Sequence, residues 1–213
     1  MSAPSTQSTV YLVDDDSSSL LATSRLLRAA GFRVQAFDSP VEFLKGFAPE
    51  QPGCLVLDLQ MPHMTGLELQ DQLDRDGVHI PIVFLTGQGD IPTGVDAIRR
   101  GAVHFLTKTA PRAHLLEAVR EAIAADAAQR EEKARLAALS APFDKLSPRE
   151  REVLAHVLRG QLNKQIAADL GIDERSVKRH RTSFMAKLQV QSVPELVRLA
   201  QSVGFAHDLK KQP

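Results

Sequence analysis

Residues 55–69 read LVLDLQMPHMTGLEL, a short apolar run that ends at Asp58 and continues into a loop containing proline. Residues 10–13 (VYLV) form a similar run, and three consecutive aspartates, residues 14–16, follow it. Short apolar runs without alternation are typical of parallel strands that are buried on both faces. The sequence therefore predicts carboxylates along the edge of a parallel sheet where two strands end.

Amphipathic stretches separate these runs throughout the first half of the chain. We predict strands at residues 10–13, 32–37, 54–57, 82–85 and 103–106. Helices are predicted at residues 17–30, from 39, at 67–73, at 94–100 and from 111. This alternation predicts an α/β fold, a doubly wound five-stranded parallel sheet with helices on both faces. Pro92 and Gly94 weaken the fourth helix, which we expect to be short or mobile.

The charge is unevenly distributed, although the total is zero. Residues 1–125 hold 15 acidic and 10 basic residues, whereas residues 144–213 hold 8 acidic and 13 basic residues. An acidic half joined to a basic half predicts two domains with different partners, and the basic half is the candidate for nucleic acid. A solvated basic surface is the alternative that charge alone leaves open.

The N-terminus and the cysteine content indicate the compartment. Residues 1–9 are small and polar and lack the apolar stretch of a signal peptide, so we expect a disordered tail. No window approaches the roughly 18 apolar residues of a membrane span. The single cysteine, Cys54, allows no internal disulfide and is typical of a reducing compartment. The sequence thus predicts a cytoplasmic protein without a membrane partner.

A helical pattern runs from Pro111 to about Leu139, and the segment Ser140-Ala141-Pro142 is expected to end it. Its second half is rich in alanine and charged residues and looks too polar for a core. We interpret residues 126–143 as a helical linker that continues the last helix of a domain spanning residues 10–125.

Residues 144–213 are predicted to form an all-α domain of four helices. Ser147-Pro148-Arg149-Glu150 has the pattern of a capping box, with Ser as the cap, Pro in the first position and Glu in the third. The expected helices begin after Ser147, span residues 163–170, run from Asp173 to about Leu188, and begin again after Ser192.

Polar side chains follow four of the predicted strands. Asp14 and Asp15 follow the first strand, Asp58 the third, Thr86 ends the fourth, and Lys108 lies just past the fifth. Right-handed crossovers place the first and third strands side by side, so these side chains meet in one pocket. Clustered carboxylates need a compensating cation, and their hard oxygens suit Mg²⁺. A hydroxyl and an ammonium group complete a set suited to phosphoryl transfer onto a carboxylate.

Four segments of the first half resemble the signature segments of response-regulator receiver domains. They are VYLVDDD, LVLDLQMPHMTGLEL, FLTGQGD and GAVHFLTK, and the resemblance covers residues 9 to about 125. It implies a flavodoxin-like sheet of strand order 2-1-3-4-5, with Asp58 as the phosphoacceptor. The metal ligands that it implies are Asp14, Asp15, Asp58 and the backbone carbonyl of Gln60, and the phosphoryl contacts are Thr86 and Lys108.

The resemblance also implies a switch. Phosphorylated Asp58 draws in the Thr86 hydroxyl, and the aromatic side chain of Phe105 fills the space that this vacates. The chain departs from the family directly after Lys108, because Thr109 stands where a proline is usual. We therefore expect a trans and looser loop there.

Residues 173–188 (DERSVKRHRTSFMAKL) carry five Lys or Arg residues, and no acid lies between Arg175 and Lys187. Helical spacing allows Val177, Phe184 and Leu188 to face inward, while Lys178, Arg179 and Thr182 share much of the outer face. A basic helix preceded by a shorter one and a glycine predicts a helix-turn-helix that inserts into the major groove of DNA.

Residues 145–200 resemble the LuxR-type effector domain, most closely that of FixJ-like response regulators. By position, Lys178, Arg179 and Thr182 correspond to residues that read bases or lie on the groove floor. The residues expected to contact phosphate or to support the helix are Asn163, Lys164, Arg175, His180, Arg181 and Lys187.

Together, the two resemblances imply a transcription regulator of a two-component system. A sensor histidine kinase would phosphorylate Asp58, and DNA binding would follow, through a homodimer on double-stranded DNA. The long helix permits either inhibition by domain contact or a simple monomer in the resting state.

The sequence argues against two other classes of function. A phosphatase using Asp58 as its nucleophile needs a general acid, commonly two residues later, and that position is Gln60. We therefore expect no enzyme beyond the chain's own phosphorylation and dephosphorylation. A ligand-responsive regulator needs an apolar, aromatic-lined pocket, which a chain with no Trp and one Tyr hardly provides.

Overall fold

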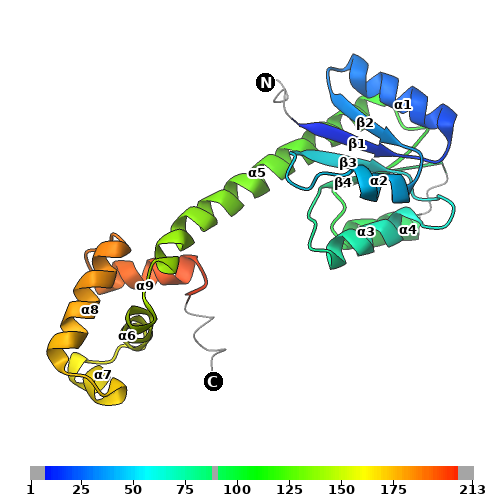
Figure 1. Cartoon of the computed structure of the whole chain (residues 1–213). Coiled ribbons are helices and arrows are strands. Elements are labelled where there is room, and N and C mark those ends of the chain that lie inside the picture. The colour runs from blue at the N-terminus through cyan, green and yellow to red at the C-terminus, as the bar shows by residue number, and fades with distance from the viewer. Residues whose placement is uncertain (1–7, 88–90, 206–213) are drawn as a thin grey trace. The chain divides into compact units, whose positions relative to one another are not determined.

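The computed structural model describes residues 8–87 and 91–205, which fall into two compact units divided after Arg130. The first unit contains a five-stranded, all-parallel sheet of order β2-β1-β3-β4-β5 (Figure 1). Its strands are β1 (Thr9–Val13), β2 (Arg33–Phe37), β3 (Gly53–Leu57), β4 (Ile82–Thr86) and β5 (His104–Thr107). The predicted fold class and strand order are confirmed.

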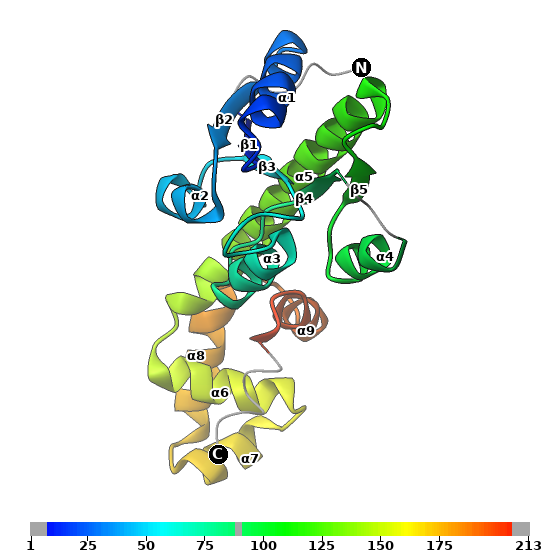
Figure 2. The same cartoon turned by 90° about the vertical axis from the view of Figure 1, so that its right-hand side faces the viewer.

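Helices cover both faces of this sheet (Figures 1 and 2). They are α1 (Ser17–Ala29), α2 (Pro40–Gly46), α3 (Gly66–Arg75), α4 (Ile91–Arg99) and α5 (Arg112–Asp144). Leu27 of α1 and Val119 of α5 are buried in the core on one face. Phe43 of α2, Leu69 of α3 and Ala97 of α4 are buried in the core on the other face. Two-sided burial explains why the strands are continuous apolar runs.

The register of the central strands brings the acidic edge together. β1 pairs with β3 so that Val13 lies opposite Leu57. The next residues are Asp14 and Asp58, and the Asp58 backbone N–H donates to the Val13 carbonyl (2.9 Å). The two aspartates therefore leave neighbouring strands at the same level, as the crossover argument predicts.

Strand β1 and helix α4 both begin earlier in the chain than predicted. Residues 1–7 of the predicted tail lie outside the described residues, whereas Ser8 and Thr9 are buried. Thr9 begins β1, and its backbone N–H donates to the Pro52 carbonyl (2.8 Å). Helix α4 begins at Ile91 instead of Gly94, which places Pro92 in the first turn, where its missing N–H costs no helical hydrogen bond.

The prediction that Ser140-Ala141-Pro142 ends the long helix is wrong. Helix α5 continues through Pro142 to Asp144. Phe143 is 2% exposed in the core of the second unit, and its ring lies 4.7 Å from that of Phe205. We attribute the extra turn to burial of Phe143, which offsets the helix-breaking tendency of the proline.

A buried carboxylate in α5 anchors this helix to the first unit. Asp126 is 2% exposed and accepts a hydrogen bond from the Gly53 backbone N–H (2.9 Å). Arg130 contacts the same carboxylate (2.9 Å) and also donates to the carbonyl of Gln51 (2.9 Å). The first turns of the predicted linker are thus attached to the loop that precedes β3.

The described residues of the second unit, up to 205, form four further helices, as predicted. They are α6 (Pro148–Leu158), α7 (Asn163–Leu170), α8 (Glu174–Lys187) and α9 (Val193–Ser202). Ser147 and Glu150 form the predicted capping box of α6, and Gly171 ends α7 in the left-handed conformation. Their apolar sides share one core with Phe143 and Leu146. In the described part of the chain, no helix is both long and apolar enough to cross a membrane.

Candidate phosphoacceptor site and nucleic-acid interface

Three carboxylates converge beyond the ends of β1 and β3. One oxygen atom from each of Asp14, Asp15 and Asp58 lies within 4.8 Å of the other two. Asp14 and Asp58 are almost fully buried, whereas Asp15 is exposed. This donor set, hard oxygens at one open edge of the sheet, fits a divalent cation such as Mg²⁺.

Lys108 joins the two buried carboxylates. Its Nζ lies 2.7 Å from Asp14 Oδ2 and 2.8 Å from Asp58 Oδ2. The pairing of β4 with β5 places it there, because the Lys108 backbone N–H donates to the carbonyl of Thr86 (2.7 Å). Ser19 Oγ also donates to Asp14 Oδ2 (2.6 Å), so the beginning of α1 supports the same carboxylate.

Electrostatics at this edge disfavours charge on Asp58. Burial raises the pKa of the Asp58 carboxyl above its ordinary value, and the hydrogen bond and charge of Lys108 offset this only in part. Burial lowers the pKa of the Lys108 ammonium, but its bonds to Asp14 and Asp58 outweigh burial and leave that pKa raised. Lys108 therefore remains charged, while the donors to Asp58 offset its burial only in part.

The other predicted site residues surround this centre at different distances from it. Thr86 ends β4 and is 1% exposed. The Gln60 backbone N–H donates to Asp58 Oδ1 (3.3 Å), which places that backbone beside the carboxylate. Phe105 lies farther down β5, where its half-buried ring centroid is 6.3 Å from that of Phe84. It belongs to the core near α4 instead of the carboxylate cluster.

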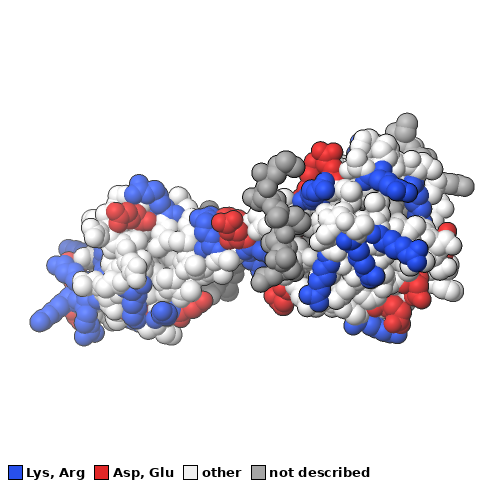
Figure 3. All heavy atoms as spheres, turned by 90° about the horizontal axis from the view of Figure 1, so that it is seen from above, with Lys and Arg blue, Asp and Glu red and all other residues white. Residues whose placement is uncertain are grey.

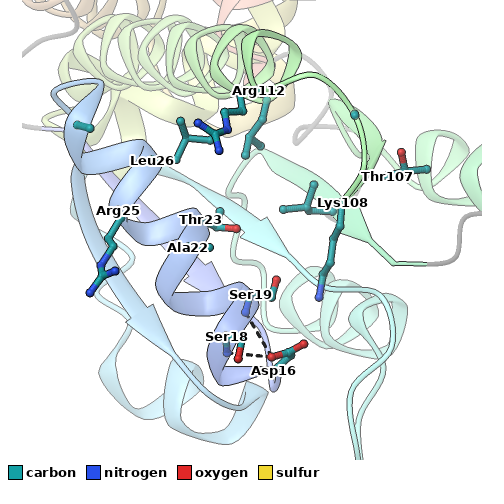
Figure 4. A pocket seen from close by; sticks show the side chains of 14 residues that line it. Asp16, Ser18, Ser19, Ala22, Thr23, Arg25, Leu26, Thr107, Lys108 and Arg112 are labelled. Atoms are coloured by element: carbon teal, nitrogen blue, oxygen red, sulfur yellow. Dashed lines mark hydrogen bonds between the residues drawn. The ribbon is translucent and has the colours of Figure 1, made fainter.

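A groove of about 840 Å³ lies between α1 and the beginning of α5 and extends to Lys108 (Figure 4). Hydroxyl groups and the side chains of Arg25 and Arg112 line it. The loop after Lys108 closes with a hydrogen bond from the Ala110 backbone N–H to the Thr107 carbonyl (2.9 Å). Every peptide bond in the described residues is trans, as expected for this loop.

Helix α8 presents the predicted basic surface in the second unit. Its cap is Asp173, whose carboxylate accepts the Ser176 backbone N–H (2.8 Å), and Val177 and Phe184 are fully buried. The exposed residues on the opposite side include Arg175, Lys178, Arg179 and Thr182. Figure 3 shows Lys and Arg side chains gathered on this unit, and basic side chains are also visible on the first unit.

Several of the predicted DNA contacts are engaged within the protein. Arg181 donates to the Asn163 side chain (2.8 Å), which ties α8 to the beginning of α7. Lys187 donates to Glu150 (2.6 Å) and to the Lys145 carbonyl (3.3 Å). Arg181, Asn163 and Lys187 thus support the helix, which was one of the two roles expected for them. Lys164 lies in the first turn of α7, and His180 is half-buried on α8.

Glu150 has a second role that its sequence pattern does not predict. Besides capping α6, its buried carboxylate accepts Ser183 Oγ (2.6 Å) and Lys187 Nζ (2.6 Å) from α8. Burial raises the pKa of Glu150, but the bonds from Lys187, Ser183 and Ser147 lower it to about 2. The capping box predicts the local bond alone, because nothing in the spacing announces a partner more than 30 residues away.

Comparisons with known proteins find relatives of both units. Residues 10–120 match the family described as "Response regulator receiver domain", and residues 144–200 match "Bacterial regulatory proteins, luxR family". The chain is 44% identical to the response regulator protein TmoT of Ectopseudomonas mendocina, over 92% of this chain and 89% of that protein. It is 39% identical to the transcriptional regulatory protein FixJ of Rhizobium meliloti, over 94% and 98%.

Solved structures resemble the whole chain as well. A structure of the response regulator StyR is 45% identical and covers 92% of this chain and 98% of its own, with a TM-score of 0.76. A structure of full-length FixJ from B. japonicum is 34% identical over 93% and 98%, with a TM-score of 0.55. The chain therefore belongs to the response regulators that join a receiver domain to a LuxR-type DNA-binding domain, which are transcription regulators of two-component systems.

Proposed function

We propose that Asp58 accepts a phosphoryl group from a sensor histidine kinase and that this phosphorylation controls DNA binding through α8. One observation carries the proposal: Lys108 bridges two buried carboxylates at the converging strand ends, beside an exposed third. Such a centre has one ammonium for three acids, so it favours an added cation, and the cation together with Lys108 then compensates the charge of an incoming phosphoryl group.

Each residue has a part in this transfer. An Asp58 oxygen attacks phosphorus, so that an O–P bond forms while the bond to the donor imidazole breaks. Lys108 neutralises the phosphoryl oxygens, and the Thr86 hydroxyl donates to one of them. Asp14, Asp15, Asp58 and the Gln60 carbonyl would hold Mg²⁺. Bound there, Mg²⁺ supplies positive charge to the phosphoryl oxygens.

The same residues support a regulator without turnover on other substrates. Gln60 occupies the position two residues after Asp58 and has no proton to give as a general acid. We propose that the chain catalyses only its own phosphorylation and the hydrolysis of the resulting acyl phosphate. The buried thiol of Cys54, the single cysteine, is in keeping with the cytoplasmic location that we propose.

Phosphorylation is proposed to act through Thr86 and Phe105 on the surface of α4. Movement of the Thr86 hydroxyl toward the phosphoryl group opens space on the side of the sheet that holds Phe105. Helix α4 exposes two apolar side chains, Val95 (45%) and Ile98 (46%). A second copy of the chain would bury them, which supports a homodimer of the phosphorylated protein.

DNA binding is proposed to use the exposed side of α8 in the major groove. Lys178, Arg179 and Thr182 are exposed there and are proposed to reach base edges, Lys178 by leaving Glu174 (3.6 Å) and Thr182 by leaving the Lys178 carbonyl (3.1 Å). Arg175, Lys164 and His180 are proposed to contact phosphate, whereas Asn163, Arg181 and Lys187 hold α8 in place.

Phosphoryl transfer is tested with radiolabelled acetyl phosphate and Mg²⁺. We expect label that alkali and hydroxylamine remove on the parent chain, none on Asp58→Asn, and parental labelling of Asp76→Asn, which alters an exposed aspartate at the end of α3. Sedimentation of the labelled protein then tests dimerisation. Unchanged mass together with unchanged DNA affinity on phosphorylation contradicts the activation model.

The DNA interface is tested by footprinting of genomic fragments with the phosphorylated protein. Arg179→Ala should weaken binding to a protected site roughly tenfold or more, because a base-reading guanidinium contributes roughly 1–3 kcal/mol. Arg159→Ala removes an exposed arginine at the end of α6 and is the matched control. Equal affinities of the two variants would exclude Arg179 from the interface.

A further inference from the structure

The backbone conformation at Gly94 does not require a glycine. Gly94 lies within α4, and its φ is not in the positive range where glycine is favoured. Glycine weakens a helix interior, because it has more conformational freedom to lose than any other residue. Something other than the backbone must therefore account for the absence of a side chain at this position.

The ring of Phe105 occupies the space that a side chain would take. A Cβ atom at Gly94 would lie 3.0 Å from Phe105 Cδ1 and 3.2 Å from Cε1, closer than ordinary van der Waals contact. Gly94 is buried beneath the ring, and α4 packs along β5 at this point (Figure 2). The bare Cα of Gly94 thus forms a seat for the ring on α4.

The same ring is placed to respond to Thr86. In the register of β4 with β5, Phe84 lies opposite Phe105 and Thr86 opposite Thr107. Side chains two residues apart on a strand share a face, so Phe105 and Thr86 lie on one face of the sheet, a single step apart. Thr86 is 1% exposed and fills its space, so the ring cannot move in that direction while Thr86 stays in place.

We propose that Gly94 is a positioning residue that holds Phe105 half-buried in the unphosphorylated protein. The seat keeps the ring one step from the position that Thr86 vacates, so that switching needs only a short movement. Without the seat, the resting ring would have to turn outward to solvent. This inference rests on the proposed switch. It adds that α4 sets the position of the Phe105 ring before phosphorylation.

The experiment places 4-fluorophenylalanine at position 105 and measures the ¹⁹F solvent isotope shift between H₂O and D₂O, which grows with exposure of the fluorine. In the unphosphorylated protein, Gly94→Ala should at least double this shift, because the methyl group occupies the seat and Thr86 blocks the inward position. Adding Thr86→Ala should reduce the shift below the parental value, because the inward space then opens.

Gly46→Ala is the matched control. Gly46 lies at the end of α2, and a Cβ there would lie 2.8 Å from a ring atom of Phe37, so the same methyl group meets the same type of ring elsewhere. It should leave the fluorine signal unchanged. A parental isotope shift in Gly94→Ala, or an equal change in Gly46→Ala, overturns the proposal.

The readout separates this inference from the proposed function. It uses unphosphorylated protein, so a chain that takes no label on Asp58 would refute the proposed function while the ring measurement still decides the role of Gly94. With acetyl phosphate and Mg²⁺, the difference in isotope shift between resting and phosphorylated protein should be larger in Gly94→Ala than in the parent. If Asp58 takes label in both proteins, an unchanged difference contradicts the proposal.

Discussion

Each unit buries a carboxylate–lysine contact, and the two contacts differ in how many donors each carboxylate receives. In the receiver domain, Asp58 receives the Gln60 backbone N–H and Lys108, and it shares Lys108 with Asp14. In the DNA-binding domain, Glu150 alone receives Lys187 together with donors from Ser183 and Ser147. The pKa of Asp58 is raised by burial, whereas the bonds to Glu150 outweigh burial and lower its pKa to about 2.

The difference separates a reactive centre from a structural one. A buried carboxylate with too few donors gains from an added cation or a covalent phosphoryl group. A carboxylate whose donors are already in place gains nothing from either, and it holds its helices together instead. Asp58 is of the first kind and Glu150 of the second, although both are buried beside a lysine.

The largest expected effect is loss of phosphoryl transfer on removal of the shared lysine. Lys108→Ala should slow labelling by acetyl phosphate roughly 10²–10³-fold, because one preorganised charge at the phosphoryl oxygens is removed. Lys187→Ala is the counterpart in the other unit and should label at the parental rate. Similar rates for both variants would remove the distinction between the two lysines.

Glu150 makes the stability of the DNA-binding domain depend on acid pH. Its folded pKa of about 2 lies below its ordinary value of 4.5, so its stabilisation is present above pH 4.5 and is lost as the pH falls toward 2. The shift corresponds to roughly 3 kcal/mol. Hydrogen exchange of α6 and α8 peptides between pH 5 and pH 2.5 measures it, and Glu150→Gln should flatten the dependence. If Glu150→Gln keeps the parental pH dependence, the stability lost in acid comes from other carboxylates.

The smallest expected effect concerns Asp126, a fourth buried carboxylate. Arg130→Ala removes one of its donors but leaves the Gly53 backbone N–H, so the receiver domain should lose only about 1–2 kcal/mol. Urea unfolding followed by the fluorescence of Tyr11 reports on this domain, because the chain has no Trp and Tyr11 is its only Tyr. Arg135→Ala alters an exposed pair on the same helix and should cause no measurable change.

Local signals were sufficient for most of the secondary structure and for the acidic edge. Apolar runs ending in Asp14 and Asp58, together with right-handed crossovers, predicted the contact between β1 and β3. The caps Ser147 and Asp173 predicted where two helices of the second unit begin. The predicted end of the long helix at Pro142 was wrong. A proline ordinarily ends a helix, and the local sequence does not show that Phe143 is buried.

The order of acidic and apolar residues along this chain was enough to identify a parallel sheet, a phosphoacceptor candidate and a basic helix, because periodicity and strand ends are local properties. Only folding decided that Glu150 receives Lys187, that Asp126 holds α5, and that Phe105 rests on Gly94. Each of these contacts joins residues 11 to 73 positions apart, and their spacing in the sequence carries no period that would reveal them.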